Sequence, residues 1–345
     1  MKGKHLIGVV LFLFFICPSF GQDTLKHHIQ VTQINEDTLK AESNLALNFG
    51  DTTKIPTLNH HRFINNQVVI DPFTKTSFRM NMGYGNSNNV SLPSFNFLDS
   101  TYSFKTGSLV YANLSFQLDA RLKDWVAFYL NIGASARVGV EPRSLYTNGL
   151  NTILAIRTGW KIRLLETKKH FLSTLVGVSN YDANITDIAE FINDLVLGIP
   201  TTGLGREVNV LQTFGGLHYA YGINSVLGLQ ITTQYNFGDL FEEGKLGGHW
   251  NLSTALDINL HPKTRIPIGV SLAYGYITIP DYTAAQYNTT SVYNGKLAYT
   301  GAGSFLISID VTSYKAAYLS GIFGGRSNTE VNVVSYSLNM LIYFN

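Results

Sequence analysis

Apolar and polar residues alternate without interruption over residues 110–122 of this sequence. The apolar set begins at Val110 and ends at Leu122, and the residues between its members are polar or amphipathic. A period of two places the two sets on opposite faces of one extended strand. After Lys123 and Asp124 the alternation resumes over residues 126–140, so this stretch predicts a long antiparallel hairpin.

The alternation recurs almost to the last residue and predicts about twelve strands, an even number, as bacterial barrels have. The clearest predicted strands are residues 109–122, 126–140, 150–165, 226–237, 249–260, 266–277, 297–311 and 331–344. Alternation is weaker over residues 77–84, 171–181, 208–221 and 314–323. An error in one of these weaker strands would change the count to about ten or fourteen.

Short and long connections between the predicted strands alternate strictly. The short ones are residues 123–124, 166–169, 222–225, 261–265 and 312–313. The long ones are residues 85–107, 141–149, 182–207, 238–248, 279–296 and 324–330. Short turns at one rim and long loops at the other are typical of transmembrane barrels.

Alternation alone does not separate a membrane barrel from a soluble sandwich, because both have one apolar face on each strand. Composition favours the barrel: charged residues make up 14% of the chain, against roughly 25% in soluble domains. Aromatic residues also gather near the ends of the apolar faces, as the interfacial girdles of a barrel require. Those at the predicted long-loop end are Trp250, Tyr274, Tyr276, Tyr299 and Phe237, with Phe305 further in and Phe344 at the short-turn end.

The last strand carries a resemblance to a known class. Val334, Tyr336, Leu338, Met340, Ile342 and Phe344 alternate up to the penultimate residue. This pattern resembles the closing strand of Gram-negative outer-membrane β-barrel proteins. The resemblance covers residues 77–345 and implies an up-and-down antiparallel barrel in outer-membrane lipid, inserted by the barrel-insertion machinery through this strand.

The N-terminus predicts an export signal over residues 1–21. Lys2 and Lys4 precede an apolar run over residues 6–16, and small residues follow at 19–21. A retained anchor helix is the alternative, but about eleven apolar residues are too few to span a bilayer. Cleavage would leave a chain without cysteine, since Cys17 is the only one. Residues 22–76 then form a polar segment, either periplasmic or inside the barrel.

Motifs for chemistry are almost absent. Residues 238–245 lack the spacing and the Ser or Thr of a phosphate loop, and there is no G-x-S-x-G sequence. His27–His28 and His60–His61 have no carboxylates at ligand spacing, so we expect neither a metal nor a cofactor. His218 falls on the inward set of its strand, which leaves the outward sets without a histidine for a barrel lipase. The net charge of +2 gives no sign of a nucleic-acid partner.

Charged residues on the inward sets are the candidate lumen-lining residues. They are Arg79, Arg121, Arg137, Arg157, Lys161 and Arg163, opposed by Asp119, Asp257 and Asp310. Arg137 and Arg157 flank one predicted loop, and we expect them to lie close together. Two interpretations remain open: a basic lumen that favours anions, or a filled barrel whose interior charges pair with one another.

One long loop has a helix signal. Residues 187–190 have the spacing of a capping box, and Gly198 and Pro200 end the pattern. The apolar residues between them have helical spacing and are Ile188, Phe191, Ile192, Leu195 and Val196. A helix over residues 187–197 could restrict the mouth of the barrel, contact a partner, or simply pack as a cap.

The sequence therefore predicts an outer-membrane β-barrel that passes small solutes, with anions as one candidate class. A barrel that transports nothing and serves as a surface or assembly partner is the alternative. A membrane-embedded enzyme is a third hypothesis without a supporting motif. Neither the solute nor the oligomeric state follows from the sequence.

Overall fold

The structure is a computed structural model of the 345-residue chain. It describes residues 55–87, 95–97, 100–102, 109–138, 149–186, 191, 194–195, 197–198, 200, 205–239, 246–280, 287–320 and 327–344. The predicted export signal over residues 1–21 and the histidines at 27 and 28 lie outside the described residues.

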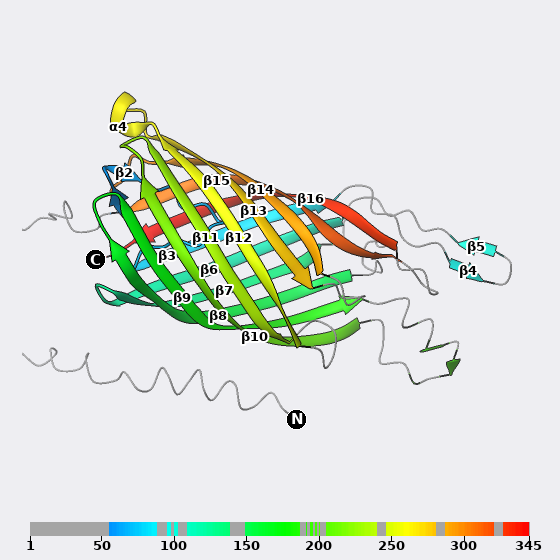
Figure 1. Cartoon of the computed structure of the whole chain (residues 1–345). Helices are drawn as coiled ribbons and strands as arrows, with labels where there is room; N and C mark the ends of the chain where they lie inside the picture. The colour runs from blue at the N-terminus through cyan, green and yellow to red at the C-terminus, as the bar shows by residue number, and fades with distance from the viewer. Residues whose placement is uncertain are drawn as a thin grey trace, which may run out of the picture. The chain divides into compact units, whose positions relative to one another are not determined.

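Twelve antiparallel strands form one closed barrel, which confirms the predicted fold class (Figure 1). The strands are β3 (Ser77–Ser87), β6 (Leu109–Lys123), β7 (Val126–Val138), β8 (Gly149–Glu166), β9 (His170–Thr186), β10 (Gly205–Gly222), β11 (Leu227–Asp239), β12 (Leu246–Asn259), β13 (Ile268–Pro280), β14 (Tyr287–Tyr299), β15 (Phe305–Ser320) and β16 (Ser327–Tyr343). Each strand pairs with the next, and β16 pairs with β3 over Ser77 to Ser87 to close the wall. A closed wall leaves no unpaired strand edge, which is the condition for crossing a bilayer with strands.

Side-chain direction follows the alternation. Outward apolar residues are exposed, for example Leu114 at 38% and Leu272 at 57%, whereas inward Asp119 and His218 are buried. The face that meets water in a soluble protein is therefore turned inward here, and the apolar face is turned out.

Two predicted strands were misplaced. The structure has β14 at Tyr287–Tyr299, within what was predicted to be mostly a long loop, and β15 runs through the predicted turn at residues 312–313. The true short turn is residues 300–304, where two glycines occur among five residues. Thr312 points inward and Ser313 outward, so the alternation continues through this polar pair and no turn forms.

This shift also moves one aromatic residue, Tyr299, from the predicted long-loop girdle to the girdle at the short-turn end. Tyr299 lies at the short-turn end of β14, beside Phe305 with ring centroids 6.4 Å apart, and not at the long-loop end as predicted. Trp125 is 50% exposed in the short β6–β7 turn. Near the long-loop end, Tyr235 packs on Trp250 with ring centroids 4.8 Å apart.

Small elements complete the described fold. A hairpin pairs β1 (Thr57–Leu58) with β2 (His61–Arg62), and β4 (Phe95–Phe97) pairs with β5 (Ser100–Tyr102). A one-turn helix, α4 (His261–Thr264), lies in the β12–β13 turn. Among the described residues, none of the helices has the length and apolarity needed to cross a bilayer.

Candidate functional site

Residues 55–76 occupy the inside of the barrel, and we call them the plug. Ile55, Leu58, Phe63, Ile64 and Phe73 are each at most 4% exposed. The plug adds no strand to the wall, because β1 and β2 pair only with each other. The wall is complete without it.

The β1–β2 hairpin attaches to the short turns on opposite sides of the mouth. Asn59 donates from its backbone N–H to the Lys168 carbonyl at 2.7 Å and from Nδ2 to the Ile223 carbonyl at 2.9 Å. Arg62 donates to the carbonyls of Thr300 at 2.6 Å and Phe305 at 3.2 Å. The hairpin therefore spans the short-turn mouth from the β8–β9 and β10–β11 turns to the β14–β15 turn.

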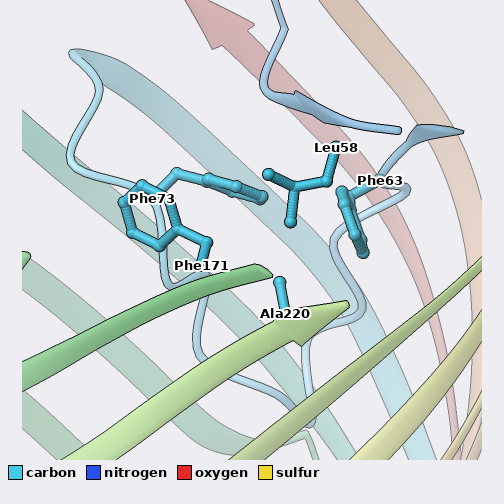
Figure 2. Packing of buried hydrophobic residues seen from close by; sticks show 5 residues of the cluster. All are labelled: Leu58, Phe63, Phe73, Phe171 and Ala220. Carbon is cyan, nitrogen blue, oxygen red and sulfur yellow. The ribbon is translucent and has the colours of Figure 1, made fainter. Parts of the chain in front are cut away.

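An apolar cluster fixes the plug just inside this mouth. Leu58, Phe63 and Phe73 of the plug pack against Phe171 of β9 and Ala220 of β10 (Figure 2). The Phe73 ring lies 4.8 Å from that of Phe171 and 5.4 Å from that of Phe63, measured between centroids. Burying each phenyl group here stabilises the docked plug by roughly 1.5–3 kcal/mol.

The deepest part of the plug makes polar contacts instead. Asn66 donates from Nδ2 to Asn294 Oδ1 at 2.7 Å and to Ser271 Oγ at 3.2 Å. Gln67 donates to Thr312 Oγ1 at 2.7 Å, and Ile70 donates its N–H to Thr232 Oγ1 at 3.2 Å. Side chains of the wall thus satisfy the hydrogen-bonding groups of a segment that pairs with no strand.

Two buried lysines link the wall to the plug. Lys161 Nζ lies 2.9 Å from Asp119 Oδ1 and donates to the Phe73 carbonyl at 3.4 Å. Lys296 Nζ lies 3.5 Å from Asp310 Oδ2 and donates to the Asn65 carbonyl at 2.8 Å. Each lysine has both an acidic wall partner and a plug carbonyl, so it keeps its counter-charge but loses one hydrogen-bond acceptor when the plug leaves.

Titratable groups of the plug are also buried. Burial lowers the pKa of His61 to about 4, so its imidazole is neutral at pH 7. Burial raises the pKa of Asp71, which the nearby charge of Lys161 opposes. The Tyr343 hydroxyl donates to Asp71 Oδ2 at 3.2 Å, and Asn65 Nδ2 contacts the same hydroxyl.

Beyond the plug, the long-loop half of the lumen is partly hollow. A cavity of about 280 Å³ lies beside Gln67 of the plug, and its walls are mainly small residues of β3, β6, β7, β8 and β16. They include Ser115, Gly133 and Ser135. Side chains of this size leave room for water above the plug.

Arg157, on the same strand β8 as the cavity residues Ile153 and Ala155, organises a chain of polar side chains that reaches β11. Its Nη2 donates to Gln234 Oε1 at 3.0 Å, and Gln234 Nε2 donates in turn to Asn236 Oδ1 at 2.5 Å. Arginine cannot accept a hydrogen bond, so it fixes the orientation of both amides. Asn236 Nδ2, next to His249 in the β11–β12 register, then remains a buried donor without a hydrogen-bond partner among the described residues.

The predicted lumen-lining residues separate into three groups. Asp119, Lys161, Asp257 and Asp310 are buried around the plug, as is Arg79, which is 9% exposed. Arg121 and Arg163 lie at the short-turn mouth and pair with Asp124 and Glu166. Arg137 lies near the long-loop end of β7 and Arg157 near the middle of β8, over the rings of Tyr111 and Phe214 respectively.

Arg137 and Arg157 are not adjacent, contrary to our expectation. Arg157 pairs with Asn131 across β7–β8, six positions from Arg137 along the same strand. At roughly 3.4 Å per residue this places them about 20 Å apart. Both flank the same loop in sequence, but Arg157 lies far down its strand.

The predicted mouth helix is described only in part. Phe191, Leu195 and Leu197 are helical, the last two being more than 60% exposed, and the pattern ends at Gly198 with φ of 66°. Ile188, Ile192 and Val196 lie outside the described residues.

Sequence reasoning missed two features of this site. Lys296 was assigned to a loop, although the inward parity of β14 would have identified it. The plug itself has no repeating period, and its only signal was an excess of buried-type residues such as Ile64, Val69 and Phe73 in a polar segment.

Comparison with known proteins adds no family. No family model matches the sequence, and no curated protein matches it. The structure is similar to the translocator domain of the autotransporter NalP from Neisseria meningitidis, with a TM-score of 0.47, 12% identity, and coverage of 90% of this chain and 94% of that one. It is also similar to a FadL homologue from Pseudomonas aeruginosa (TM-score 0.41, 10% identity, 85% and 100% coverage) and to an outer membrane channel from Pseudomonas putida F1 (TM-score 0.45, 9% identity, 82% and 100% coverage).

Proposed function

We propose that this protein is an outer-membrane channel for small polar solutes that the plug closes at rest. The observation that carries the proposal is the independence of wall and plug: β16 and β3 close the barrel directly, while residues 55–76 only fill it. Moving one segment would therefore open a passage without breaking a strand pair. The deepest wall contacts of the plug are polar, among them Ser271, Asn294 and Thr312, which water can solvate.

The outward surface supports a bilayer location. Leu272, Leu297 and Ile309 are each more than half exposed, on strands whose outer face no other described residues cover. Such a surface is stable in lipid and would aggregate in water. Export by the N-terminal signal and insertion through the C-terminal strand belong to this proposal.

The solute class we infer is small anions. Arg137 lies near the long-loop end of β7 and Arg157 near the middle of β8, and no Asp or Glu lies among the inward residues described between these levels and the long loops. In the Arg157–Gln234–Asn236 chain each amide oxygen already accepts one hydrogen bond, and the guanidinium group supplies a positive charge. A focused positive potential raises the local concentration of anions and lowers that of cations.

A reversible tether tests the gate. Asn66 Nδ2 lies 3.2 Å from Ser271 Oγ, so Asn66→Cys with Ser271→Cys places one thiol on the plug and one on the wall. The only native cysteine is Cys17, within the predicted signal. A short bis-methanethiosulfonate reagent, which joins the two thiols through disulfides, should hold the channel closed in planar bilayers, and reductant should cleave the disulfides and restore its openings.

Deleting residues 55–75 is the complementary variant. We expect a folded, steadily conducting barrel with anion preference, and Arg157→Gln should weaken that preference. A folded deletion variant that carries no current would contradict the channel.

The alternative function is a barrel that never opens and serves as a surface or assembly partner. The two lysine anchors favour it, because undocking would take the Phe73 and Asn65 carbonyls away from the buried ammonium groups of Lys161 and Lys296. If the deletion variant conducts but the full chain never opens at any voltage, tethered or not, this alternative is supported.

A further inference from the structure

A second cavity, of about 400 Å³, lies at the seam between plug and wall at the short-turn mouth. The plug contributes Ile55, Leu58 and Phe73, and the wall contributes Arg121, Arg163 and Phe171. The volume is within the range of about 300–1,000 Å³ that small-ligand sites have. This cleft has no part in the passage described above.

The charged side of the cleft carries Arg121 and Arg163 together with Asp124 and Glu166, and these ion pairs are open to exchange of partners. Arg121 lies 3.3 Å from Asp124, and Arg163 pairs with Glu166, in both cases three residues along the chain. The four side chains are 41%, 74%, 29% and 48% exposed, and ion pairs this exposed contribute little, about 0–1 kcal/mol. A bidentate anion can therefore compete for the two guanidinium groups, which lie on the inward sets of β6 and β8.

The other side of the cleft is apolar. Leu58, Phe73 and Phe171 belong to one buried cluster and are each 3% exposed, and Ile55 is 4% exposed. The little of this face that water reaches is apolar, and the apolar body of a ligand that covers it gains roughly 25 cal/mol for each Å² buried.

We infer that this cleft binds an amphipathic organic anion, with its carboxylate at Arg121 and Arg163 and its apolar body against Leu58, Phe73 and Phe171. The ligand would contact plug and wall together, so it would bind only the docked arrangement and stabilise it by mass action. This regulatory consequence rests on the proposed gating function, whereas the binding itself does not.

Calorimetry on the full chain in nanodiscs tests the binding without measuring current. The probe is 4-phenylbutanoate, and its neutral amide is the matched control. We expect the acid to bind at least tenfold more tightly than the amide, and Arg121→Gln with Arg163→Gln to remove that difference. Arg265→Gln, an exposed arginine in another short turn, should change nothing.

A second variant separates filling of the cleft from loss of charge. Thr57 is exposed and lines the cavity, so Thr57→Trp should occupy it and abolish binding while both arginines remain. Equal affinity for acid and amide, or binding that Thr57→Trp leaves intact, would overturn the inference. Binding to the wild type with no channel current in any variant would uphold the site and reject the gate.

Discussion

The two halves of the lumen have the same polar strand pattern and opposite contents. In the short-turn half, buried charges such as Lys161 and Lys296 find partners on the plug. From the middle of the wall toward the long loops, the contacts of Arg157 among the described residues are a neutral amide and an aromatic ring, and a cavity remains. An inward polar face therefore does not establish an open lumen. Whether the lumen is filled depends on the plug, which is not part of the wall.

Glycine illustrates the same difference. A Cβ on Gly222 would lie 2.2 Å from the Leu58 carbonyl oxygen, so the plug backbone needs a bare wall there. A Cβ on Gly133 would meet nothing nearer than Ser115 Cβ at 3.8 Å. Gly222 is required because the plug backbone approaches it closely, whereas Gly133 has room for a side chain.

The largest expected effect is the loss of a lysine anchor. Lys161→Met leaves Asp119 buried without its partner, and we expect a loss of about 3–5 kcal/mol in the free energy of unfolding from lipid vesicles. Arg157→Met in the hollow half leaves no carboxylate unpaired and should cost about 1 kcal/mol. Similar losses at both positions would remove the distinction between the halves. Lys161→Met with Asp119→Leu should recover most of the stability.

Arginine substitutions test the outward and inward faces. Leu114→Arg places a charge in lipid and should cost about 2–4 kcal/mol, whereas Ser115→Arg points into the cavity and should cost much less. Ser173→Arg also points inward, but Ser173 Oγ donates to the Pro72 carbonyl at 2.7 Å, so this variant should displace the plug and raise channel opening. Folding into vesicles and bilayer currents give the two readouts; an equal cost at positions 114 and 115 would refute the assigned faces.

A single methyl group should distinguish the two glycines. Gly222→Ala should weaken plug docking by about 1–3 kcal/mol, because overpacking forces the plug backbone to shift. Gly133→Ala should have no measurable effect. The yield of the Asn66–Ser271 tether reports docking directly, and an unchanged yield in Gly222→Ala would show that the plug does not pack against that strand.

The smallest expected effect is a pH dependence of docking through His61. Its pKa is about 4 when docked, against about 6.5 in a released plug, so its contribution is complete above pH 6.5 and is lost as the pH falls toward 4. Lowering the pH from 7.5 to 6 should weaken docking by about 1 kcal/mol through this group. The raised pKa of Asp71 would strengthen docking as the pH falls, and this contribution is the same in the wild type and in the His61→Gln variant. Opening probability should therefore rise less on acidification in His61→Gln than in the wild type; identical responses would exclude His61.

Sustained alternation was enough to predict the wall. Strands such as β6 and β12 differ strongly between their two faces, and each was placed to within a few residues. β14 was missed because its first half, Tyr287 to Ser291, is polar on both faces, so it has no contrast to detect. The polar pair Thr312 and Ser313 has the composition of a turn, although it lies inside β15.

The plug could not be predicted in the same way, because its partners are distant. Ile64 donates its N–H to Asp257 at 2.9 Å, and Asn66 contacts Asn294, each more than 190 positions away. The partners of successive plug residues lie on different strands around the barrel, so the plug sequence itself shows no repeating pattern. The sequence left two locations open for residues 22–76 because nothing local distinguishes them.

Both ends of the plug lie at the same mouth. Ile55 N–H contacts the Gly303 carbonyl in a short turn at 3.5 Å, and the Thr76 carbonyl accepts from Phe344 N–H at 2.9 Å at that same rim. The segment therefore enters and returns as a hairpin, and its insertion requires no threading of a free end through a sealed ring. Assembly of the wall and seating of residues 55–76 can occur in either order, and a synthetic peptide of these residues should be able to reseat in a wall that has already closed without them.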